Sequence, residues 1–138
     1  MQDYSKFEDL GATIVAVSCE EIVKGKELLK KLSLPFILLS DTQFEAIDRY
    51  GVRDGNPSEM LRARGITQLS KPAAFIIDEA GIVRYKYVGK NAPDRPKNLD
   101  LLRVLGEMSR STKASSLPQN HESALDQASS LRQKEMGD

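Results

Sequence analysis

The chain has 138 residues, of which 20 are Lys or Arg and 20 are Asp or Glu, so its formal net charge is zero. That balance gives no electrostatic reason to bind nucleic acid or an anionic membrane, and we expect neither. With one cysteine, Cys19, and one histidine, His121, no internal disulfide and no Cys/His zinc site can form, so we expect neither metal nor cofactor. The first residues lack the pattern of a signal peptide, which predicts a cytoplasmic or other soluble intracellular protein.

Helix and strand patterns alternate in the first part of the chain. Residues 3–10 have apolar side chains at helical spacing and are followed by Gly11, a common helix end. Residues 12–17 and 34–41 are short, apolar and β-branched, as in buried parallel strands. A short helix over residues 44–50 follows the second of these runs. The order strand, helix, strand, helix predicts a parallel sheet of the α/β class.

Between the two strands, Ser18 stands three residues before Glu21, which is the spacing of a capping box. This motif predicts a helix that begins at about Cys19 or Glu20 and continues to residue 32. Its alternating lysines and glutamates are typical of a solvent-exposed helix face.

Residues 71–89 contain the strongest β signal. Residues 73–77 are continuously apolar, as in a strand buried on both faces, and residues 82–88 predict an antiparallel edge strand. Asp78 and Gly81 provide the turn of this hairpin, because Asp bonds nearby backbone and Gly accepts a positive φ. Pro72 lacks an amide hydrogen and therefore belongs at the entrance of the first strand. We expect residues 52–70 to be an irregular connection with a helical turn at 59–64.

The composition changes near residue 110. Residues 99–108 predict a final amphipathic helix, whereas residues 111–138 have no aromatic residue, valine or isoleucine. Such a segment buries too little apolar surface to offset its ordering entropy. We therefore expect a domain over residues 1–110 and a disordered tail over 111–138, with a transient helix at 124–131. His121 falls in this tail and is interpreted as a solvated side chain.

With these elements placed, residues 10–105 resemble the peroxiredoxin-like branch of the thioredoxin superfamily, the alkyl hydroperoxide reductase and thiol-specific antioxidant type. The matching stretches are residues 10–18 (LGATIVAVS), 34–41 (LPFILLSD), 49–52 (RYGV), 71–78 (KPAAFIID) with Gly81, and 87–89 (YVG). The resemblance implies a thioredoxin-like three-layer sandwich with a mixed sheet. It also implies thiol-dependent reduction of hydroperoxides, with thioredoxin or glutathione as reductant.

The same resemblance places the reactive cysteine of the family ahead of the segment that begins here at Met1. Family members carry it in a P-x-x-x-T-x-x-C or C-x-x-C motif, between a central strand and a helix, and neither motif occurs in this sequence. We therefore expect a fold that lacks the N-terminal central strand and its cysteine helix. Our hypothesis is a C-terminal portion of a redoxin domain, arising from truncation, an alternative start or a split gene.

Two residues are candidates for a site. By carry-over from the family, only Pro72 matches an active-site position, where a cis X-Pro bond is expected. Cys19 is the sole thiol and follows a strand at the start of a helix, a position that favours thiolates, but Glu20 and Glu21 place negative charge beside it. We interpret Cys19 as structural and name no confident catalytic residue. Asp94 and the adjacent Arg95 are weaker candidates for a surface ion pair or a small-anion site, and we interpret them as part of a solvated loop.

Two functions follow. In the first, the chain is an antioxidant oxidoreductase of the peroxiredoxin class by ancestry and is inactive alone. In the second, it is a non-catalytic thioredoxin-fold interaction module or truncated isoform that accepts a strand from a partner or forms a homo-oligomer. Without a central strand, the runs at residues 12–17 and 73–77 each lose a hydrogen-bonding neighbour, which is costly for a buried backbone.

Overall fold

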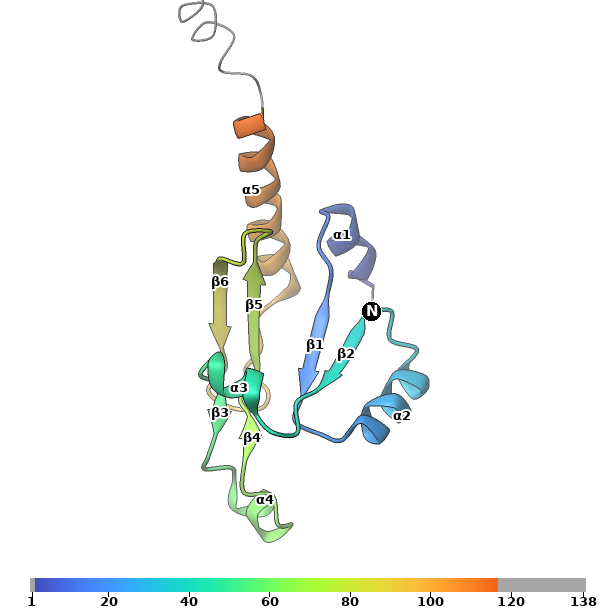
Figure 1. The fold of residues 1–138 in the computed structure, drawn as a ribbon, viewed down its shortest axis with the longest axis vertical. Helices are drawn as coiled ribbons and strands as arrows, with labels where there is room; N and C mark the ends of the chain where they lie inside the picture. The colour runs from blue at the N-terminus through green and yellow to red at the C-terminus, as the bar shows by residue number, and fades with distance from the viewer. Residues whose placement is uncertain (1, 117–138) are drawn as a thin grey trace, which may run out of the picture. The chain divides into compact units, whose positions relative to one another are not determined.

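The computed structural model describes residues 2–116. Its elements, in chain order, are α1 (Tyr4–Asp9), β1 (Val15–Ser18), α2 (Ile22–Leu32), β2 (Ile37–Ser40), α3 (Glu45–Arg49), β3 (Arg53–Asp54), α4 (Glu59–Ala63), β4 (Leu69–Ser70), β5 (Ala73–Ile77), β6 (Val83–Val88) and α5 (Asn98–Ser116) (Figure 1). The predicted α/β class is confirmed. The chain divides into two compact units, Met1–Leu105 and Gly106–Asp138, which are described separately.

The strands of the described residues form three two-stranded sheets. β1 pairs with β2 in parallel, and β5 pairs with β6 in an antiparallel hairpin (Figure 1). β3 and β4 form a third, antiparallel pair. Within this part of the chain, β1 and β5 therefore each have one edge without a strand partner, in agreement with the prediction that a shared neighbour would be lacking.

Helix α2 covers one face of the β1–β2 pair. A Cβ atom added at Gly25 would lie 3.6 Å from Cδ2 of Leu38, so the helix backbone lies directly against this side chain. Because side chains alternate along a strand, the residues on either side of Leu38 point to the opposite face. That face carries Val15, Val17, Ile37 and Leu39, whose exposed fractions are 45 to 52%. One face of this sheet is thus packed and the other is open.

The buried core of the described residues is small and contains Phe7, Ile47, Val52 and Ile76. Helix α3 lies next to β5, since the rings of Tyr50 and Phe75 meet edge to face with centroids 4.7 Å apart. The prediction that both faces of β5 are buried was wrong, because Ile77 is 44% exposed. The face of β5 that carries Ile77 is therefore open at that position, whereas the opposite face buries Ile76.

The turn between β5 and β6 forms as the sequence predicts. Oδ1 of Asp78 accepts hydrogen bonds from the amides of Ala80 and Ile82, both at 2.9 Å, and Gly81 has a φ of +80°. Oδ2 of Asp78 also forms an ion pair with Nε of Arg84 at 2.6 Å. This hairpin is therefore stabilised by contacts within its own turn.

The predicted capping box is not formed. Helix α2 begins at Ile22, and its N-cap residue Glu21 makes no side-chain capping bond. The Ser18 hydroxyl instead accepts a hydrogen bond from the amide of Glu20 at 3.1 Å. Ser18 still belongs to β1, so its side chain closes a short turn after the strand and the helix starts later than expected.

The connection between α3 and β5 is more ordered than predicted. It contains the β3–β4 pair and helix α4, which confirms the expected turn at residues 59–64 but adds two strands. Strand β1 begins at Val15, three residues later than expected. Helix α5 continues to Ser116, so residues 111–116 are helical where a tail was predicted. The rest of that tail, with His121 and residues 124–131, lies outside the described residues.

Ile47 is the most buried side chain of this small core, at 3% exposure. We expect Ile47→Ala to lower the free energy of unfolding by about 2–4 kcal/mol, because it removes buried methyl groups and leaves a cavity. The measurement is urea unfolding followed by far-UV circular dichroism. As a control, Met60→Ala truncates a side chain that is 68% exposed and should change stability by about 0.5 kcal/mol or less. Equal losses in the two variants would show that α3 is not part of the core.

Candidate functional site

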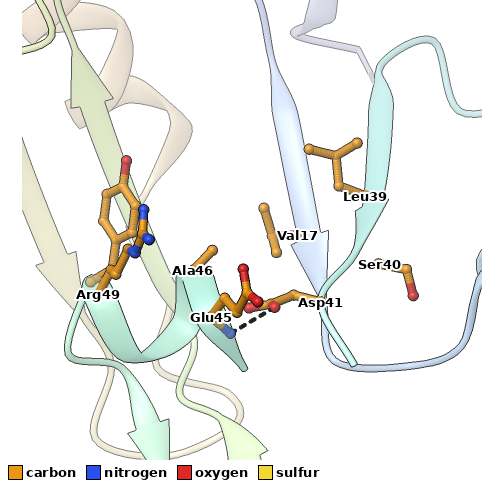
Figure 2. Close-up of a pocket in the computed structure, with 8 residues that line it drawn as sticks. Val17, Leu39, Ser40, Asp41, Glu45, Ala46 and Arg49 are labelled. Atoms are coloured by element: carbon orange, nitrogen blue, oxygen red, sulfur yellow. Dashed lines mark hydrogen bonds between the residues drawn. The ribbon is translucent and has the colours of Figure 1, made fainter. Parts of the chain in front are cut away.

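A pocket of about 310 Å³ lies at the carboxyl ends of β1 and β2, where they approach α3. Figure 2 shows its residues, with Val17 and Leu39 on the strands and Ala46 and Arg49 on the helix. The remaining lining residues are Ser40, Asp41, Glu45 and Tyr50. The carboxyl ends of parallel strands are where α/β folds usually place their sites. The sequence signal that could have indicated this pocket is the polar pair Ser40 and Asp41 at the end of an apolar strand.

Asp41 fixes the edge of this pocket. Its amide donates to the Ser18 carbonyl oxygen at 2.7 Å, which joins the ends of the two strands. Its carboxylate accepts hydrogen bonds from the amides of Glu45 and Ile47, both at 2.9 Å (the first is drawn in Figure 2). These are free amides of the first turn of α3, so Asp41 stabilises the start of that helix. The Asp41 carboxylate is therefore a structural anchor.

Arg53 holds the other end of α3. Its guanidinium makes two hydrogen bonds of 2.6 Å to the carboxylate of Asp48 and lies 4.3 Å from the ring centroid of Phe44. It also donates a hydrogen bond to Gln68 on the segment leading to β4. The hydrogen bonds from Arg53 lower the pKa of Asp48, and Asp48 in turn raises the pKa of Arg53. This pair fixes Phe44, whose φ of +59° is unusual for a residue with a side chain.

Cys19 lies between β1 and α2, with its side chain partly buried, and is not among the residues that line the pocket. The loop around it is held by two hydrogen bonds, from the Ser40 hydroxyl to the Glu20 carbonyl and from the Asp41 amide to Ser18. The two candidates from sequence adjoin different sheets, since Cys19 follows β1 and Pro72 precedes β5. No role in a reaction follows for either from these contacts.

Pro72 stands at the entrance of β5, as predicted, and its carbonyl accepts a hydrogen bond from the Gly89 amide at 2.7 Å. The expected cis bond was wrong, since no peptide bond of the described residues is cis. The trans form of an X-Pro bond is favoured unless the surroundings select the other isomer. Here Lys71 bonds to Val52, and the extended path into β5 accommodates the trans form.

Asp94 is bonded within its own loop. Its carboxylate accepts hydrogen bonds from the Tyr87 hydroxyl and, at 2.7 Å, from the Lys90 amide. The Tyr87 bond is the largest cause that lowers the pKa of Asp94, and the same bond raises the pKa of Tyr87. Gly89 allows the loop to close, because a Cβ there would lie 2.1 Å from the Asp94 carbonyl oxygen. Asp94 is thus a loop anchor.

The pocket offers apolar side chains, two carboxylates and the guanidinium of Arg49, but no thiol. It could hold a small polar group but has no strong nucleophile for attack on a peroxide. Among residues 2–116, no three His, Cys, Asp or Glu side chains gather closely enough to hold a metal ion. Over the same residues, every helix is too short or too polar to cross a membrane.

Comparison with known proteins identifies the family of this chain. The model of the AhpC/TSA family matches residues 1–86. The chain belongs to the AhpC/TSA family. It is similar to the chloroplastic peroxiredoxin Q of Oryza sativa subsp. japonica, with 29% identity over 92 residues that cover 67% of this chain and 38% of the relative. It is also similar to the peroxiredoxin Q of Sedum lineare, with 30% identity over 104 residues that cover 74% of this chain and 51% of the relative.

Solved structures confirm the predicted fold. A peroxiredoxin 6 of Arenicola marina matches with a TM-score of 0.69 and 18% identity, over 80% of this chain and 52% of that chain. Mycobacterium tuberculosis AhpC matches with a TM-score of 0.62 and 20% identity, over 84% and 58%. The AhpC/TSA chain described here therefore has the peroxiredoxin variant of the thioredoxin-like fold. It spans between about a third and a half of the length of these curated relatives.

The Tyr87–Asp94 bond predicts acid sensitivity of the loop. Because the pKa of Asp94 is lowered in the folded chain, its contribution to stability is present above the unfolded value of about 3.9 and is lost as the pH falls through the folded value. Tyr87→Phe removes the largest cause, so we expect a smaller decrease of the melting temperature between pH 6 and pH 3 than in the wild type. Tyr85→Phe, on the same strand, is the matched control and should keep the wild-type decrease. Identical pH profiles for all three proteins would contradict this assignment.

Proposed function

We propose that this chain serves the thiol-dependent reduction of hydroperoxides typical of the peroxiredoxin class, and that alone it reduces little or no peroxide. Membership of the AhpC/TSA family supports the class of chemistry. The observation that carries the proposed inactivity is the position of Cys19, the single thiol of the chain, outside the pocket at the strand ends. In this proposal, Cys19 is not the thiol that attacks the peroxide.

The reaction defines what is missing from the pocket. A cysteine thiolate attacks one oxygen of the O–O bond, the cysteine becomes a sulfenic acid, and water or an alcohol leaves after protonation. A reductant thiol then forms a mixed disulfide with loss of water, and a second thiol releases the reduced cysteine. The attacking thiolate needs an electropositive surrounding. Cys19 has Glu20 and Glu21 as its sequence neighbours, which supports a structural role for it.

The proposal also includes a reductant and a cellular location. Thioredoxin or glutathione would supply the reducing thiols, as the class of chemistry requires a thiol donor. A cytoplasmic or other soluble intracellular location is part of the proposal, whereas the curated relatives named above are chloroplastic. Pro72, at the entrance of β5 and in its trans form, is proposed to belong to the active-site loop, as at the matching position of the family.

The second candidate function is a non-catalytic interaction module. The open edge and open apolar face of the β1–β2 pair favour it, because they are surfaces that a partner could bury. The two functions differ in peroxide turnover, which the module would lack in every context.

The proposed inactivity is tested with a Cys19→Ser variant. Hydrogen peroxide consumption is measured with dithiothreitol, and separately with thioredoxin and its reductase, for the wild type and the variant. We expect both proteins to consume peroxide no faster than an equal concentration of free N-acetylcysteine, because Cys19 lies outside the pocket. Turnover by the wild type at ten times that rate or more, abolished in Cys19→Ser, would identify Cys19 as the reactive thiol and overturn the proposal.

A further inference from the structure

Asp54 and Gly55 form the single Asp-Gly pair of the sequence, which contains no Asn-Gly pair. Asp54 is the last residue of β3, and Gly55 begins the exposed connection to α4. Aspartate isomerises most readily before glycine, because a glycine carries no Cβ atom that hinders the approach of its amide nitrogen to the preceding carboxyl group. The end of β3 is therefore a candidate for a covalent change in the main chain.

The space around Gly55 is open. A Cβ atom placed on Gly55 would meet no heavy atom within 4 Å apart from its chain neighbours, and the residue is exposed. The Asp54 side chain bends toward the following peptide units, since its Oδ1 accepts a hydrogen bond from the Asn56 amide at 3.0 Å. The carboxyl group therefore lies on the same side of the chain as the peptide that would attack it.

Other aspartates of the described chain are held more firmly. The carboxylates of Asp41, Asp48 and Asp78 each accept two or more hydrogen bonds. Each of these residues is followed by one with a side chain, which hinders the same attack. Asp54 combines an exposed glycine neighbour with a lightly held carboxyl group.

The β3–β4 pair controls access to the reaction. An extended backbone turns the Gly55 nitrogen away from the Asp54 carboxyl carbon, so cyclisation requires residue 54 to leave its strand conformation. The pair consists of two residues on each strand, with Asp54 opposite Leu69. Short two-stranded elements have little stability of their own and open locally at a small cost in free energy.

We propose that Asp54 forms isoaspartate when the β3–β4 pair opens, and that the product is a substrate for an enzyme that methylates isoaspartyl carboxyl groups. The Gly55 amide nitrogen bonds to Cγ of Asp54, and the amide proton leaves with the carboxyl hydroxyl group as water. Water then opens the cyclic imide. Opening at Cγ restores aspartate, whereas opening at the main-chain carbonyl leaves the chain linked through Cγ. This inference is independent of the proposed function, since no thiol, oxidant or reductant takes part.

The product changes the local structure because it inserts the Cβ atom of residue 54 into the main chain. The side-chain acceptor of the Asn56 amide is lost, and residue 54 no longer fits its register opposite Leu69. We expect the β3–β4 pair to stay open in the modified chain. The β5–β6 hairpin is stabilised within its own turn by Asp78 and should stay formed.

The test ages the purified full chain at neutral pH and physiological temperature for several weeks. Isoaspartate is measured by enzymatic transfer of a radioactive methyl group from S-adenosylmethionine, and mass spectrometry of tryptic peptides locates it. We expect it in the peptide of residues 54–62, at unchanged mass and with a different elution time. Asp54→Glu should abolish the signal, because cyclisation through a longer side chain is much slower, and Gly55→Ala should lower it several-fold. Asp9→Glu alters an exposed aspartate that precedes leucine and should keep the wild-type amount.

Arg53→Gln tests the role of strand opening. It removes the hydrogen bonds to Asp48 and Gln68 that hold β3. We expect isoaspartate to accumulate several-fold faster in this variant, with circular dichroism as the check that it folds. In the aged wild type, the Lys71 amide, which bonds to the Val52 carbonyl, should exchange its hydrogen faster than in fresh protein.

Three results would overturn the proposal: aged wild type without isoaspartate at residue 54, an undiminished signal in Asp54→Glu, or accumulation in folded Arg53→Gln no faster than in the wild type. The peptide map of the wild type locates the modification without any variant. A variant that fails to fold therefore leaves the main test intact.

Discussion

One-sided backbone hydrogen bonding along β1 is the constraint on which this structure depends. The amides and carbonyls on the free edge of β1 find no strand among the described residues, and the same holds for β5. Buried backbone groups without partners are costly, so these strands must keep their free edges accessible to water. The core of the described residues is also small and consists of Phe7, Ile47, Val52 and Ile76.

Polar contacts stabilise the region around α3, where few apolar side chains are buried. Around α3, the carboxylate of Asp41 caps the helix, and Arg53 joins Asp48 to the ring of Phe44. The Tyr50 and Phe75 rings then connect this helix to β5. The Asp41, Arg53 and Phe44 contacts join residues that are close in the sequence, and the Tyr50–Phe75 pair is the longer-range contact. The pocket beside α3 can therefore keep its shape without a closed sheet next to it.

The sequence predicted those features whose determinants are local. The β5–β6 turn was correct because Asp78 and Gly81 define it by themselves, and β5 was placed at its observed bounds. Two predictions that failed, the burial of both faces of β5 and the cis bond at Pro72, concerned tertiary surroundings. The capping box failed although it is local, because Ser18 belongs to β1 and its hydroxyl accepts from the Glu20 amide. The β3–β4 pair was missed because two residues per strand leave no periodic signal. The pocket was missed because Arg49 and Asp41 come to line one cavity only after the chain folds.

Family membership and catalytic chemistry rest on different features of a chain. The fold follows from strand order and hydrophobic pattern over most of residues 1–86, which match the AhpC/TSA family. Thiol chemistry in general depends on the electrostatic setting of one sulfur, and a fold does not determine such a setting. The loop that holds Cys19 is tied to the end of β2 through Ser40 and Asp41, so its position is fixed by the two strands that are present. The place of Cys19 is thus explained by hydrogen bonds at the ends of the β1–β2 pair, and it lies outside the lining of the pocket.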